Sequence, residues 1–157
     1  MRLSIIVLLS IVTILIFSLG VVSVAEKQIP GSFMSGKELS SPNDWIKEEE
    51  IKVFNNRVTI YVNDPTWASF TNTNSMDPFI DETSNAIQIS PKSPEMIKIG
   101  DVISYRSSYG TIIHRVIEVN EDKEGVYFKV KGDNNAYPDS QKVRFDEIIG
   151  VVIAVVY

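Results

Sequence analysis

Three residue types that hydrolytic enzymes combine occur at separate places in this chain. Ser75 lies in the stretch TNTNSMDPFI (71–80), where Ser, Asn, Asp and Pro are typical of a turn. A serine hydroxyl is a weak nucleophile, so it needs a neighbouring base, and that base needs an orienting group. His114 is the only histidine of the 157 residues, so it is the one imidazole available as that base.

His114 lies in TIIHRVIEV (111–119), whose pattern is typical of an apolar strand. Strand alternation places Ile112, His114 and Val116 on one face. An imidazole must be uncharged to act as a general base, and an apolar neighbourhood favours the uncharged form. The structural alternative is a core histidine that bonds a backbone carbonyl.

Two aspartates follow in the turn-rich stretch KGDNNAYPDSQKVR (131–144). Asp133 and Asp139 are six residues apart on one loop, and either can accept a hydrogen bond from the second ring nitrogen of His114. The alternatives are a cluster of Asx turns or a calcium loop. The spacing lacks the glycine and the final glutamate of an EF-hand loop, which argues against calcium.

Composition excludes several other kinds of chemistry. The chain has no cysteine and one histidine, which rules out disulfides, thiolate nucleophiles and a metal site with several histidines in one chain. The formal charge of −5 is unlike the basic footprint of a nucleic-acid binder. We therefore expect no nucleic-acid partner, and the serine chemistry considered above would need no metal and no nucleotide cofactor.

The elements that would position these residues are mainly β. Strand-like runs are IKVF–NN–RVTIYV (51–62, a hairpin), NAIQI (85–89), DVISY (101–105), TIIHRVIEV (111–119) and GVYFKVK (125–131). The apolar run at 148–157 predicts a buried closing strand. Ser41 and Pro42 predict the start of a short helix through NDWIKEEE (43–50). We expect a compact, mostly antiparallel β domain.

The first 25 residues differ from the rest. Leu3–Ala25 contains no charge and no proline and is long enough, as a helix, to cross a bilayer. A cleaved signal peptide is the alternative, since Ser23, Val24 and Ala25 fit a small-x-small cleavage site, but its apolar region is usually shorter. We expect a transmembrane anchor at 1–25, a linker or neck at 26–44 and a catalytic β domain at 45–157. Arg2 favours an N-terminus inside the cell, which places the domain on the extracytoplasmic side.

The order of these motifs is similar to that of a known family. NSMDP, GDVISY, IIHRVIEV and KGDNN resemble the consecutive boxes of type I signal peptidases. The resemblance is greater to the archaeal and endoplasmic-reticulum branch, in which histidine replaces the lysine base of most bacterial enzymes. It covers about residues 70–139, together with the position of the anchor. The chain departs from the family in its IDETSNAIQI stretch and in lacking a glycine just before the serine.

The resemblance implies a role for each matching residue. Ser75 matches the nucleophile, His114 the base and Asp139 the third catalytic residue, while Asp133 matches a neighbouring aspartate that supports the site. Thr73 and the backbone N–H of Ser75 match the oxyanion hole.

The function implied is that of a membrane-anchored, single-pass serine endopeptidase of the cell membrane. Its partners would be the signal peptides of exported preproteins and the lipid bilayer. One alternative is a self-cleaving repressor of related fold, but such proteins use a lysine base and usually carry a DNA-binding domain. A second is a non-enzymatic anchored β domain that binds extended peptides or calcium.

Overall fold

A computed structural model describes residues 38–157, of which Leu39–Tyr157 form one compact unit. The expected anchor at 1–25, and the expected neck up to residue 37, lie outside the described residues. Within residues 38–157 no helix is long and apolar enough to cross a membrane.

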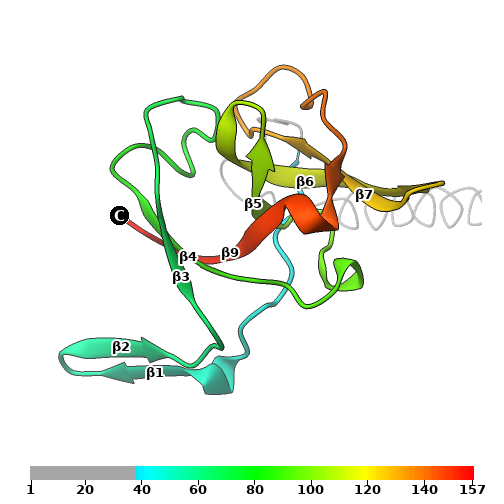
Figure 1. Cartoon of the computed structure of the whole chain (residues 1–157). Coiled ribbons are helices and arrows are strands. Elements are labelled where there is room, and N and C mark those ends of the chain that lie inside the picture. Colours follow the sequence, from blue (N-terminus) through cyan, green and yellow to red (C-terminus); the bar gives the residue numbers. More distant parts are fainter. Residues whose placement is uncertain (1–37) are drawn as a thin grey trace, which may run out of the picture. The chain divides into compact units, whose positions relative to one another are not determined.

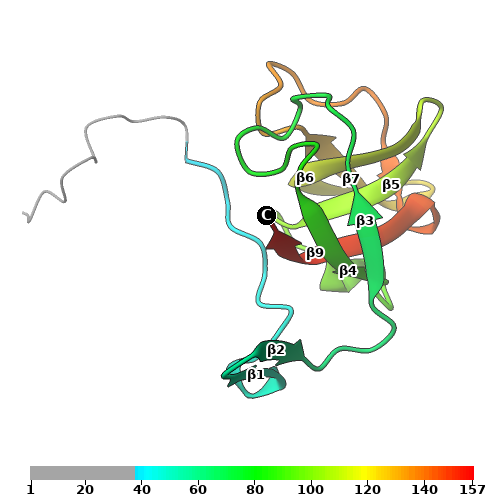
Figure 2. The same cartoon turned by 90° about the vertical axis from the view of Figure 1, so that its left-hand side faces the viewer.

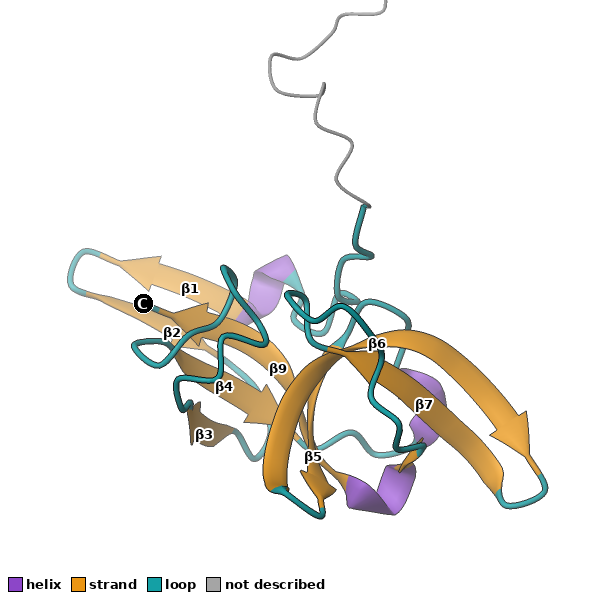
Figure 3. Cartoon of the chain, turned by 90° about the horizontal axis from the view of Figure 1, so that it is seen from above, coloured by secondary structure: helices purple, strands orange, loops and turns teal. Residues whose placement is uncertain are grey.

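The described part of the chain is mainly β and antiparallel, as predicted (Figure 1). Its strands are β1 (Ile51–Phe54), β2 (Arg57–Ile60), β3 (Thr66–Ser69), β4 (Asn85–Ile89), β5 (Val102–Ser107), β6 (Gly110–Asp122), β7 (Gly125–Lys131), β8 (Val143–Arg144) and β9 (Ile148–Val156). Within residues 38–157, helical structure is limited to the 3₁₀ turns η1 (Glu48–Glu50), η2 (Pro94–Met96) and η3 (Phe145–Glu147), drawn purple in Figure 3.

β1 and β2 form a two-stranded sheet of their own, turning at Asn55 and Asn56 as predicted. The other strands form a seven-stranded sheet in the order β3-β4-β9-β5-β6-β7-β8. The apolar run at 148–157 is a strand, but it does not close the sheet. It lies between β4 and β5 and pairs with both, and its residues 150–152 are buried.

The sheet buries two hydrophobic clusters on its opposite faces, because side chains alternate along each strand. On β5, Ile103 and Tyr105 belong to the first cluster, with Val116, Phe128 and Val130. Val102 belongs to the second cluster, which includes Met76 and Ile80 from the loop after β3. That loop is thereby fixed to the sheet by its apolar residues.

The predicted helix at 42–50 is wrong except for its last turn, η1. The carboxylate of Asp101, fully buried, accepts hydrogen bonds from the backbone N–H of Asn43 (2.7 Å) and the indole of Trp45 (2.9 Å). These tertiary bonds hold the segment extended against the domain and override its helix propensity.

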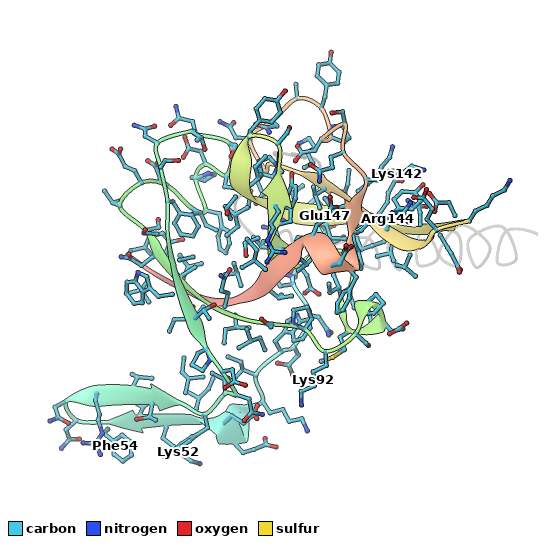
Figure 4. All side chains as sticks on the ribbon, in the orientation of Figure 1. Lys52, Phe54, Lys92, Lys142, Arg144 and Glu147 are labelled. Atoms are coloured by element: carbon cyan, nitrogen blue, oxygen red, sulfur yellow. The ribbon has the colours of Figure 1, made fainter. Side chains whose placement is uncertain are left out.

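A basic cluster ties β8 to the β6–β7 hairpin. Lys142 and Arg144 both donate to Asp122 at 2.8 Å and lie side by side in Figure 4. The hydrogen bond from Lys142 is the main reason that the pKa of Asp122 falls to about 2. Lys52 and Phe54 lie away from this cluster, on the β1–β2 hairpin (Figure 4).

Candidate active site

Ser75 opens a turn in the loop between β3 and β4. Two backbone bonds to Met76 O, from Phe79 N (2.9 Å) and Ile80 N (3.0 Å), close this turn. The preceding residue, Asn74, has a left-handed backbone (φ 55°), a conformation that asparagine tolerates better than most residues. Met76 points into the core and is 2% exposed, whereas Ser75 is half-buried. The turn therefore presents the serine at the edge of the core.

The loop after β7 holds the Ser75 turn from the other side. Asn134 N donates to Ser75 O (3.0 Å), and Asn134 Nδ2 donates to Asn74 O (2.9 Å). Gly132 is required by this close approach, because a Cβ there would lie 2.5 Å from Ser75 O. Figure 2 shows the two loops, green and orange, on the same side of the sheet.

His114 is 5% exposed and projects from β6. Its Nδ1 lies 2.7 Å from Oδ2 of Asp139. Asp139 reaches this position because its backbone N–H bonds back to Val130 O of β7 (2.9 Å). With an ionised carboxylate as the acceptor, Nδ1 carries the proton and Nε2 is left as the free, basic nitrogen.

Tyr105, on the neighbouring strand β5, also donates its hydroxyl to Asp139 Oδ2. Burial disfavours the charge on Asp139, but the hydrogen bonds from His114 and Tyr105 outweigh it and lower the pKa of Asp139. Burial, reinforced by the same carboxylate, raises the pKa of Tyr105 well above its ordinary value. Tyr105 therefore stays a donor and Asp139 stays an anion at neutral pH.

Asp133 has a different partner. Its two oxygens accept from Nε (2.8 Å) and Nη2 (2.7 Å) of Arg115, and both side chains are 8% exposed. Arg115 also donates to Gly100 O (2.8 Å) and Ser40 O (3.3 Å). Because Arg115 follows His114 on β6, it points to the other face of the sheet. Asp133 thus fixes the loop that contacts Ser75 and makes no hydrogen bond to His114 among the described residues.

A cavity of about 470 Å³ is bordered by three of the predicted residues. Ser75, Thr73 and His114 all line it. Ser75 Oγ lies 3.2 Å from Thr73 Oγ1, and within residues 38–157 no hydrogen bond joins Ser75 to His114. Hydrogen bonds of this kind are often long in free enzymes and tighten when substrate binds. No group of three or more His, Asp or Glu side chains is arranged to hold a metal ion in the described part of the chain.

Sequence reasoning missed Tyr105 and Arg115 as members of this site. The sequence pattern places Tyr105 in a strand but assigns it no role, and it assigns none to Arg115. Two local signals could have found them: Tyr105 lies on the strand that pairs with the strand of His114, and Arg115 is a charged residue within an apolar run.

Tyr105→Phe tests whether the tyrosine hydroxyl positions and ionises Asp139. Loss of this hydrogen bond should raise the pKa of Asp139. Ionised Asp139 stabilises the fold at pH values above the ordinary aspartate pKa of about 3.9. This stabilisation is lost as the pH falls through the lowered pKa that Asp139 has in the folded protein. In the variant this loss should begin at higher pH, so the acid-unfolding midpoint should rise. An acid-unfolding curve followed by circular dichroism measures it, and Tyr109→Phe, at an exposed tyrosine, is the control.

Comparison with known proteins gives one distant relationship. Signal peptidase I W of Bacillus subtilis is 29% identical to the chain over 75 residues. The matched region is 47% of this chain and 40% of that protein, so the chain spans about two-fifths of the length of this relative. No protein-family model and no solved structure matches the chain. The similarity supports a distant, signal peptidase I-like relationship.

Proposed function

We propose that this chain is a membrane-anchored serine endopeptidase that cleaves signal peptides from exported preproteins, with a histidine base as in the archaeal and endoplasmic-reticulum branch. The observation that carries the proposal is the 2.7 Å contact of His114 Nδ1 with Asp139, on a histidine that lines the same cavity as Ser75. The distant similarity to a signal peptidase I supports the reaction class.

In the proposed reaction Ser75 Oγ attacks the scissile carbonyl carbon while Nε2 of His114 takes its proton. Asp139 stabilises the imidazolium that forms. The Ser75 N–H, which makes no hydrogen bond among residues 38–157, and the Thr73 hydroxyl donate to the oxyanion. His114 then gives its proton to the leaving amine. A water molecule, deprotonated by His114, hydrolyses the ester on Ser75 and regenerates the enzyme.

The substrate chain would add as a strand to the sheet. β3 is an edge strand of the seven-stranded sheet, and its Ala68 and Ser69 line the cavity. An extended peptide can pair with such an edge through backbone hydrogen bonds and place alternate side chains in the cavity. The proposed anchor at 1–25 would hold the domain at the extracytoplasmic face of the membrane, where signal peptides emerge.

Cleavage of a preprotein by the full chain in detergent tests this function. We expect one cut, after a small residue, with both fragments identified by mass spectrometry. Activity should persist with excess EDTA, because the proposed chemistry needs no metal. A preprotein with leucine in place of the small residue before the cut should remain intact. Binding of the peptide without any cut would instead favour the peptide-binding alternative.

A further inference from the structure

The cavity beside Ser75 is mostly apolar but contains a buried amide. Gln88, on β4, lines it and is only 5% exposed. Ser104, on β5, also lines it and is 2% exposed. Apolar neighbours in the same lining include Ala68, Met76 and Ile113. A polar pair in such a place costs free energy unless its hydrogen bonds are made.

Gln88 and Ser104 are held in place by their mutual hydrogen bond and by the strand that lies between them. Ser104 Oγ donates to Gln88 Oε1 at 2.6 Å. β9 separates β4 from β5, and its Gly150 leaves room for the glutamine to reach across. A Cβ at Gly150 would lie 3.0 Å from Cδ of Gln88. The glutamine side chain is therefore fixed by a hydrogen bond on one side and by close packing on the other.

One end of this amide has no hydrogen-bond partner in the described part of the chain. Among residues 38–157 no hydrogen bond uses Gln88 Nε2, although Oε1 is bonded. No fully buried side-chain nitrogen or oxygen in this part of the chain lacks a partner, so Nε2 must have some access to solvent. Because the residue lines the cavity, the amide meets solvent there.

We propose that Gln88, oriented by Ser104, selects a hydroxyl-bearing residue, serine or threonine, in the peptide that the enzyme cleaves. This inference rests on the proposed function and adds a substrate preference to it. A hydroxyl suits the site because its oxygen can accept a hydrogen bond from Nε2, the end of the amide that Ser104 leaves free. An asparagine side chain would bring two further N–H donors toward an amide whose free end is itself a donor, and alanine would leave that end without a partner.

The test is a set of peptides that carry Ala, Ser, Thr, Asn or Val, one change at a time, at each of the three residues before the cut. At one of these positions we expect serine to exceed alanine in kcat/KM by about tenfold, because one buried hydrogen bond is gained. Gln88→Leu should reduce that ratio to about one. Ser104→Ala, which frees the amide to turn, should reduce it in part. Gln141→Leu and Ser90→Ala are matched controls outside the cavity and should keep the wild-type ratio.

The same peptides separate failure of this inference from failure of the proposed function. Their dissociation constants are measured on Ser75→Ala protein by isothermal titration calorimetry. A serine preference in binding without cleavage by the wild type would uphold the hydroxyl site and overturn the peptidase. Cleavage with equal rates for serine and alanine at every position, or a preference that Gln88→Leu retains, would overturn the hydroxyl site. Absence of both cleavage and binding would overturn both. If Gln88→Leu does not fold, equal wild-type kcat/KM values for serine and alanine at every position would still overturn the hydroxyl site.

Discussion

Ser75→Ala is expected to abolish cleavage of a preprotein while the domain stays folded. In serine peptidases, loss of the nucleophile lowers kcat by roughly 10⁶-fold, and the remaining activity comes from binding and the oxyanion hole. The change should hardly affect stability, because within residues 38–157 the Ser75 hydroxyl hydrogen-bonds only to Thr73, which is exposed. Substitutions of this kind usually stay within about 0.5 kcal/mol of the wild-type free energy of unfolding.

The measurement is single-turnover cleavage, followed on a gel, together with the melting temperature of each variant. Ser90→Ala is the matched control, since Ser90 is exposed and its hydroxyl, among the described residues, bonds only Ile149 O (3.2 Å). Cleavage by Ser75→Ala at the wild-type rate, from a preparation free of other peptidases, would show that another group is the nucleophile. It would also remove the main support for the proposed peptidase.

The strands could be predicted where pattern and turn signals agreed. β4 and β7 have the predicted bounds, because each is a run of alternating or β-branched residues between turn formers. β3 was missed because TWAS is short and has no such pattern. β8 has two residues, too few for any periodicity. The failed helix at 42–50 has a tertiary cause, the buried carboxylate of Asp101, which lies 56 residues from Trp45 in sequence.

The residues of the candidate site also differ in how far the sequence predicts them. The proposed roles of Ser75 and His114 could be predicted from their residue types and from the strand pattern. From the residues alone, Asp133 and Asp139 were equivalent, since both lie on one turn-rich loop. Two tertiary contacts in the structure separate them. The backbone N–H of Asp139 bonds to β7, and Asp133 forms an ion pair with Arg115 on the opposite face of the sheet from His114. The polar pair Gln88–Ser104 was not predicted, because its partners come from strands that are not adjacent.

Asp139→Asn should mainly lower activity, whereas Asp133→Asn should mainly lower stability. Asparagine at 139 cannot stabilise an imidazolium and favours the wrong tautomer of His114, so kcat should fall by about 10³–10⁴-fold. The fold should be retained, because an amide can still accept from Tyr105. Asparagine at 133 leaves the buried guanidinium of Arg115 without its counter-charge. Removing one partner of a buried ion pair costs about 3–5 kcal/mol, so Asp133→Asn should melt well below the wild type.

Turnover below the melting range and the melting temperature itself are measured for each variant. Asp146→Asn, at an exposed aspartate, is the control and should change neither quantity. The double variant Arg115→Met/Asp133→Leu should recover part of the stability lost in Asp133→Asn, because replacing a buried ion pair with apolar side chains is often close to neutral. That recovery would attribute the instability to the unpaired charge rather than to the loop. A stable but inactive Asp133→Asn, beside an active but unstable Asp139→Asn, would reverse the two assignments and make Asp133 the partner of His114 in catalysis.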